Sequence, residues 1–152
     1  MEKEISKAQL ESIRPYCKRA LFTVGLLMRH FDFTDKDVRD GLPEDLKDQV
    51  FSTLFFFVHD PSPDIQNYTM KAIGSLCIRH YEFMLGNELK QLYYKLLTES
   101  DAPLAMKAQV LHNIEMYLQE EETRMIKQDQ ECKFLFFFFF NILLSSLKLS
   151  LL

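Results

Sequence analysis

One five-residue pattern occurs twice, and this repetition constrains the fold more than any other feature of the chain. Residues 29–33 read Arg-His-Phe-Asp-Phe and residues 79–83 read Arg-His-Tyr-Glu-Phe, so each position keeps its chemistry. Each copy closes an apolar stretch of helical character. Internal similarity at a spacing of a few tens of residues is typical of helical repeat arrays, which offer extended surfaces to large partners.

The composition permits a packed core but gives no β-sandwich pattern. Of the 152 residues, 47% are hydrophobic and 26% charged, glycine occurs only 4 times, and β-branched residues do not alternate with polar ones. A net charge of −4 does not by itself indicate nucleic-acid binding. Cys17, Cys77 and Cys132 are odd in number and far apart, which favours a reducing compartment over a disulfide framework or zinc site. The charged N-terminus is not a secretory signal peptide.

Apolar residues at three- and four-residue steps predict five helices, with Pro15 in the first turn of the first one. The polar stretch 34–44, which contains Gly41 and Pro43, is expected to be a loop. The predicted helices span about 15–33, 45–59, 64–82, 87–98 and 103–131. The first helix is expected to bury Ala20, Leu21, Val24, Leu27, Met28 and Phe31. Gly25 and Gly74 lie inside helices, where close approach of another helix would explain them.

Two helix pairs superpose when the sequence is shifted by 38 residues, which places Leu54 on Leu92 and Leu76 on Ile114. A period near 40 with two helices per unit predicts an all-α, HEAT-like helical-repeat solenoid segment of antiparallel helix pairs. A compact helical bundle is the alternative architecture. The residues expected to be buried are Leu54, Ile73, Leu76, Leu92, Leu111 and Ile114.

After Cys132 the composition changes to phenylalanine, leucine and serine. Residues 1–132 are therefore predicted to form the repeat segment, and 133–152 an apolar low-complexity tail outside it. Three interpretations stay open: translated noncoding sequence, an apolar capping helix, or a membrane anchor, for which Lys148 and the serines make a poor span. An exposed tail of this kind is expected to make the chain self-associate.

No catalytic, cofactor-binding or metal-ligating residues are assigned. The four histidines show neither the i, i+4 spacing of a helical metal site nor a neighbouring cysteine. His30 and His80 occupy equivalent helix ends, where a structural role at terminal carbonyls is expected. The histidines are His30, His59, His80 and His112.

The charged residues form a basic group and an acidic run. The basic group on the first helix is either a solvated face or a contact for phosphate. It consists of Arg14, Lys18, Arg19 and Arg29. The acidic run 120–122 is expected to be a solvated face with an ion pair between Glu120 and Arg124, and a patch for a basic partner is the alternative.

Two strings, at 21–33 and 116–125, and the phrase Lys-Ala-Ile at 71–73 resemble the Nipped-B-like family of cohesin loading factors. The resemblance covers about residues 6–131. It implies a HEAT-repeat protein without enzymatic activity that loads cohesin onto chromosomes in the nucleus and contacts the cohesin ATPase heads, the kleisin and DNA. It also implies roles in sister chromatid cohesion, the cell cycle, transcription regulation and DNA repair, with no cofactor, small-molecule substrate or membrane.

This chain is far shorter than that family's members, and its tail does not resemble them. The resemblance therefore implies a fragment or an aberrant product of a loader, and loading activity of the chain in isolation does not follow from it. The alternative function is a generic helical adaptor that binds a peptide or a small GTPase. An enzyme would need a nucleophile, base or metal constellation, which the sequence does not present.

Overall fold

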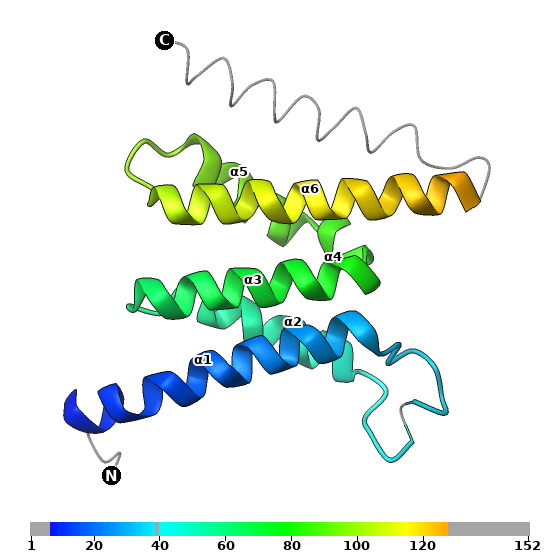
Figure 1. Ribbon diagram of the computed structural model, residues 1–152, viewed down its shortest axis with the longest axis horizontal. Coiled ribbons are helices and arrows are strands. Elements are labelled where there is room, and N and C mark those ends of the chain that lie inside the picture. The colour runs from blue at the N-terminus through cyan, green and yellow to red at the C-terminus, as the bar shows by residue number, and fades with distance from the viewer. Residues whose placement is uncertain (1–6, 39, 128–152) are drawn as a thin grey trace. The chain divides into compact units, whose positions relative to one another are not determined.

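The computed structural model describes residues 7–38 and 40–127, and these residues form six helices and no strand (Figure 1). The all-α class predicted from the sequence is confirmed for this part of the chain. The predicted tail at 133–152 lies outside the described residues. The helices are α1 Lys7–His30, α2 Leu46–Phe57, α3 Pro63–Arg79, α4 Glu82–Leu85, α5 Asn87–Thr98 and α6 Leu104–Lys127.

Within the described residues, the helix boundaries agree with the predicted ones to within two residues except at three places: the start of α1, its end at His30 rather than 33, and the end of α3. The prediction for α5 is confirmed at both ends, but α1 begins at Lys7, so Pro15 lies inside it rather than in its first turn. The proline removes one backbone bond, to the carbonyl of Glu11, and the ion pair between Arg14 and Glu11 bridges the same turn. The third predicted helix, at 64–82, ends at Arg79, and the short α4 follows as a separate helix.

The helix boundaries repeat at a spacing of 41 residues. From α2 to α5 the first residue moves from 46 to 87 and the last from 57 to 98, and α3 and α6 begin at 63 and 104. Six buried positions of α3 and its C-terminal end recur on α6 at this spacing. The pairs are Ile65 with Met106, Thr69 with Val110, Ala72 with Asn113, Ile73 with Ile114, Leu76 with Tyr117, and His80 with Glu121.

The predicted shift of 38 residues is correct for the buried faces of α2 and α5 and wrong for those of α3 and α6. Phe51 and Leu54 match Leu89 and Leu92, and all four side chains are buried. The shift of 38 paired Leu111 with Ile73, but Leu111 is 38% exposed, so its predicted burial is wrong. Its neighbour Val110 occupies the buried stripe, and one residue along a helix turns the side chain by about 100°. The other five predicted core residues are buried: Leu54, Ile73, Leu76, Leu92 and Ile114.

The chain divides into two compact units between Leu76 and Cys77, and unit 1 contains α1, α2 and most of α3. In unit 1, α1 and α3 lie side by side (Figure 1). A Cβ atom built on Gly25 would lie 2.9 Å from the Cα of Ala72, which confirms the predicted close approach at this glycine. Lys18 pairs with Asp64, which precedes Ala72 along α3 as Lys18 precedes Gly25 along α1, so the two helices run parallel.

The first helix buries fewer residues than the sequence predicted. Leu21 and Met28 are buried and Val24 is half-buried, but Ala20, Leu27 and Phe31 are exposed, against the prediction. The apolar period of α1 therefore marks a helix, while its burial depends on which neighbouring helix covers each side.

Unit 2 begins at Cys77 and contains α4, α5 and α6. Helices α5 and α6 pack against each other, and the five-residue connection 99–103 makes them antiparallel neighbours. Their buried contact includes a polar pair, in which the Asn113 side-chain amide donates a hydrogen bond to the Tyr93 hydroxyl at 2.9 Å. The stacking of both units into one continuous solenoid stays a prediction.

Candidate interaction surface

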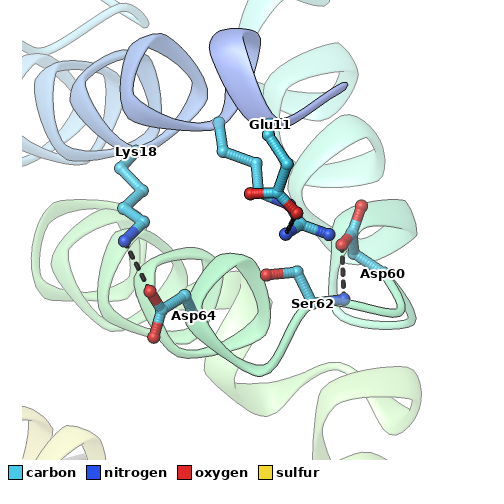
Figure 2. Close-up of polar contacts among 6 residues, drawn as sticks. Glu11, Lys18, Asp60, Ser62 and Asp64 are labelled. Atoms are coloured by element: carbon cyan, nitrogen blue, oxygen red, sulfur yellow. Dashed lines mark hydrogen bonds and ion pairs between the residues drawn. The ribbon is translucent and has the colours of Figure 1, made fainter. Parts of the chain in front are cut away.

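A group of polar side chains in unit 1 lies where α1 faces the beginning of α3, and we call it the polar seam (Figure 2). The Lys18 ammonium binds the Asp64 carboxylate across the two helices, and the remaining contacts are local. The polar seam consists of Glu11, Arg14, Lys18, Asp60, Ser62 and Asp64.

The turn between α2 and α3 positions Asp64 in this seam. The Asp60 carboxylate accepts a hydrogen bond from the Ser62 backbone N–H at 2.8 Å. The side chain of Gln66 donates to the Asp60 carbonyl at 2.7 Å, and its backbone N–H donates to the Ser62 carbonyl at 3.0 Å. These bonds satisfy groups that a helix start leaves unpaired and fix the first turn of α3. As a result Asp64 reaches across to α1.

The ion pair between Lys18 and Asp64 shifts the pKa of both groups. The hydrogen bond from Lys18 lowers the pKa of the Asp64 carboxyl, and the same bond raises the pKa of the Lys18 ammonium. Both side chains are solvent-accessible, at 31% for Lys18 and 69% for Asp64, so water screens the pair and it contributes little to stability. Its geometry orients the two helices rather than supplying a reactive group.

Three cations near this surface, including Lys18, lie close to aromatic rings. The Lys18 and Lys71 ammonium groups lie 5.8 and 5.3 Å from the ring centroid of Tyr68, within the range of cation–π attraction. Arg19 lies 5.8 Å from the ring of Tyr16.

The four basic residues singled out in the sequence therefore do not form one free cationic patch. Arg14 and Lys18 are paired with carboxylates, and Arg19 lies over an aromatic ring. Arg29 is half-buried near the end of α1. To bind phosphate, Arg14 would have to give up its contact with Glu11, and Lys18 its contact with Asp64. The sequence pattern could not reveal the second contact, because Asp64 lies 46 positions from Lys18.

An apolar groove lies between α1 and α2, and we call it the α1–α2 groove. Its volume is about 320 Å³, and Gln49 and Thr53 are its only polar lining residues. A groove of this composition accepts apolar side chains but offers no group for acid–base chemistry. Its remaining lining residues are Ala20, Leu21, Val24, Leu46, Val50, Leu54 and Phe57.

The two histidines of the repeated pattern lie in different environments. His30 is the exposed last residue of α1, whereas His80 follows α3 and is buried, with its carbonyl accepting a hydrogen bond from the Phe83 N–H at 3.3 Å. His80 thus lies at the junction of α3 and α4, where a structural position was expected. The two histidines were expected to be equivalent, but they differ in burial, because neighbouring residues cover His80 and leave His30 exposed.

In unit 2, Arg124 joins α6 to the end of α3. Its guanidinium donates hydrogen bonds to the Ile78 carbonyl and to the Glu121 carboxylate and lies 4.7 Å from the centroid of the Tyr81 ring. The predicted ion pair of Arg124 with Glu120 is therefore wrong, and Glu121 is buried rather than solvated. Both i, i+3 and i, i+4 spacings permit such pairs, so only the packing of α6 decides between them.

Two buried titratable groups of unit 2, Cys77 and Tyr93, are held neutral. Burial raises the pKa of the Cys77 thiol and of the Tyr93 hydroxyl well above their ordinary values, so neither ionises near neutral pH. Within residues 7–38 and 40–127, no three His, Cys, Asp or Glu side chains are grouped so that they could hold a metal ion. Over the same residues, no helix is long and apolar enough to span a membrane.

Comparison with known proteins gives one consistent family. The human Nipped-B-like protein is 34% identical over 132 residues, which is 87% of this chain and 5% of the relative. The Nipped-B protein of Drosophila melanogaster is 33% identical over 121 residues, or 77% of this chain and 6% of the relative. Nipped-B-like protein scc-2 of Caenorhabditis elegans is 31% identical over 116 residues, or 73% of this chain. The chain thus spans about a twentieth of these relatives, and no family model matches it.

Proposed function

Because the chain belongs to the Nipped-B-like family, we propose that it is a non-catalytic scaffold segment of a cohesin loader. In this role it contributes binding surface when cohesin is loaded onto chromatin for sister chromatid cohesion. Its partners are the cohesin complex, through the ATPase heads and the kleisin, and chromatin DNA. The proposed location is the nucleus, and the proposed wider roles are in the cell cycle, transcription regulation and DNA repair.

The observation that carries this proposal is the repeat at 41 residues. The starts of α2 and α3, the end of α2 and the buried positions of α3 recur at that spacing on α5 and α6, in the range of HEAT-type repeats. Proteins built from such repeats bind along extended surfaces, because each repeat adds to a surface rather than enclosing a pocket for a small molecule. A binding role is therefore the function that the architecture favours.

The surfaces available for binding differ in chemistry. The polar seam offers charged groups that exchange partners at little cost, because Lys18 and Asp64 are exposed. The α1–α2 groove offers apolar surface. Electrostatic contacts set association rates and specificity, whereas buried apolar anchors supply most of the affinity.

A binding experiment with the full 152-residue chain tests the proposal. Purified cohesin ring, isolated kleisin and duplex DNA are titrated separately onto the immobilised chain at several salt concentrations. We expect saturable binding to cohesin or the kleisin, and DNA binding, if present, that weakens steeply with salt. No saturable binding to any of the three, from a chain whose circular dichroism is helical, would refute the scaffold role.

A matched pair of variants identifies the binding surface. Lys18→Glu reverses a charge in the polar seam, and Lys95→Glu reverses one on α5, where Lys95 pairs with Glu99 across an exposed turn. If the seam contacts the partner, Lys18→Glu weakens binding and Lys95→Glu does not. Equal effects of both variants would assign the contact to net charge alone.

A further inference from the structure

The α1–α2 groove is open at positions where the repeat normally buries side chains. The last residues of α1 and α3, His30 and Arg79, are 49 positions apart. At that spacing Val24 and Ala20, which both line the groove, correspond to Ile73 and Thr69 of α3, which are fully buried. Ala20 is exposed and Val24 is half-buried. One side of α1 thus keeps the apolar pattern of a covered helix without the cover.

Unit 2 shows which kind of element covers the corresponding side of α6. The equivalent stripe of α6 is buried, and α5, whose buried residues are Leu89, Leu92 and Tyr93, packs against α6. Helix α5 has 12 residues, so the covering element is about 18 Å long at the helical rise. An occupant of the α1–α2 groove therefore needs a stretch of similar length with large apolar side chains.

The same chain contains a segment with these properties. Residues 134–147 include no charged residue and consist of phenylalanine, leucine, isoleucine, serine and one asparagine. Fourteen residues span about 21 Å if helical, close to the length of α2, which forms one wall of the groove. Burying phenylalanine and leucine side chains removes apolar surface from water, which favours docking.

We propose that the α1–α2 groove is the docking site for residues 134–147 of a second copy of the chain. The six residues 128–133 that join the segment to α6 span at most about 20 Å, and short connections of this kind favour exchange between copies. Each copy offers one groove and one segment, so mutual exchange closes a dimer, whereas one-way docking continues beyond a dimer. This inference is independent of cohesin.

Two threonines provide a matched test. Thr53 lines the groove, is exposed, and donates its hydroxyl to the Gln49 carbonyl at 2.7 Å. Thr98 is equally exposed at the end of α5, outside the groove lining, and donates to the Tyr94 carbonyl at 2.8 Å. The substitutions Thr53→Glu and Thr98→Glu therefore make the same chemical change, but only the first places a carboxylate where apolar residues must dock.

The experiment measures association of the full chain by sedimentation equilibrium over a concentration series. We expect concentration-dependent oligomers, a dissociation constant raised about tenfold or more by Thr53→Glu, and no change from Thr98→Glu. Phe137→Glu, in the segment itself, should have the same effect as Thr53→Glu. A monomeric wild-type chain, or equal effects of the two threonine variants, would overturn the proposal.

A crosslinking measurement identifies the occupant directly. A photoreactive benzoylphenylalanine at position 53 is activated in an equal mixture of nitrogen-15-labelled and unlabelled full chains, and crosslinked peptides are mapped by mass spectrometry. Mixed-isotope crosslinks to residues 134–147 support the proposal. Crosslinks to that segment within one copy only, or crosslinks to other regions only, contradict it.

Discussion

Helices α1 and α6 have the same length, 24 residues, and the same apolar period, but they are buried to different extents. Val110, Ile114 and Tyr117 of α6 are buried, since α5 packs against this helix. The corresponding residues of α1 at the spacing of the repeat, Ala20, Val24 and Leu27, are exposed or half-buried. Periodicity therefore defines a helix, whereas burial requires a second element on the same side.

The two units also differ in how their helices are linked by polar groups. In unit 1 the link between α1 and α3 is the exposed ion pair of Lys18 with Asp64. In unit 2 the link from α6 is Arg124, which is half-buried and bound to the Ile78 carbonyl and to the buried Glu121. Charged hydrogen bonds strengthen as water is excluded, so we expect the second link to contribute more to stability.

The largest expected effect is the loss of stability when a buried leucine is truncated, compared with the loss at the equivalent exposed leucine. Leu76 is 0% exposed and its counterpart Leu27 is 43% exposed. We expect Leu76→Ala to lower the free energy of unfolding by about 2–5 kcal/mol through lost transfer energy and a cavity, and Leu27→Ala to lower it by about 1 kcal/mol or less. Urea denaturation of the full chain, followed by circular dichroism, measures both. Similar losses for the two variants would show that α1 is covered in solution.

Gly25→Ala tests the contact between α1 and α3. Alanine is the better helix former, but its Cβ would lie 2.9 Å from the Ala72 Cα, a backbone atom that cannot rotate away. We expect a net loss of about 1–3 kcal/mol in unfolding free energy from overpacking. Thr23→Ala, an exposed change on the same helix, is the control and should be nearly neutral. A stabilised Gly25→Ala variant would mean that α1 and α3 separate readily.

Arg124→Lys tests how much the hydrogen bonds of Arg124 in unit 2 contribute to stability. Lysine keeps the charge but lacks the planar fork that reaches Glu121 and the Ile78 carbonyl together. We expect a loss of about 1–2 kcal/mol in unfolding free energy. The exposed Lys95→Arg on α5 serves as the reciprocal control and should have little effect. If Arg124→Lys is neutral in the same denaturation assay, then Tyr81 packing rather than hydrogen bonding retains the side chain.

The smallest expected effect concerns the ion pair of unit 1. The pKa of Asp64 is lowered in the folded chain, so its contribution to stability is present above its ordinary pKa of 3.8 and is lost as the pH falls below that value. The pKa of Lys18 is raised, so the contribution persists up to its ordinary value of 10.5 and is lost above it. Asp64→Asn should therefore lower the melting temperature slightly at pH 7 and not at pH 2.5. A difference that persists at pH 2.5 would assign the effect to shape rather than to charge.

Much of the fold could be predicted from local patterns. The limits of α5 and the turn before α3 follow from proline, glycine and apolar spacing, which act within a few residues. The spacing of the repeat was predicted less well, because the faces of α2 and α5 match at 38 residues while the helix boundaries recur at 41. Because of that difference, Leu111 was wrongly predicted to be buried. The path of α1 through Pro15 and the separate α4 depend on neighbouring turns that local propensity does not specify.

The polar contacts were the least predictable part of the interaction surface. Sequence spacing permits Arg124 to pair with Glu120 or Glu121, and nothing local indicates that Lys18 meets Asp64 from another helix. The α1–α2 groove likewise joins residues from two helices that are separated by a long loop. Such contacts depend on how helices are aligned, which is a property of packing.

The sequence by itself determined that this chain is helical, where most helices begin and end, and to which family it belongs. Those properties follow from apolar periodicity, from helix-breaking residues and from identity along the chain, all of which are one-dimensional. The tertiary structure decided which apolar sides are covered, that Gly25 lies against Ala72, and that Glu121 rather than Glu120 binds Arg124. The physical reason is that burial and ion pairing depend on distances between elements, and a helix presents several apolar sides of which its neighbours cover only some.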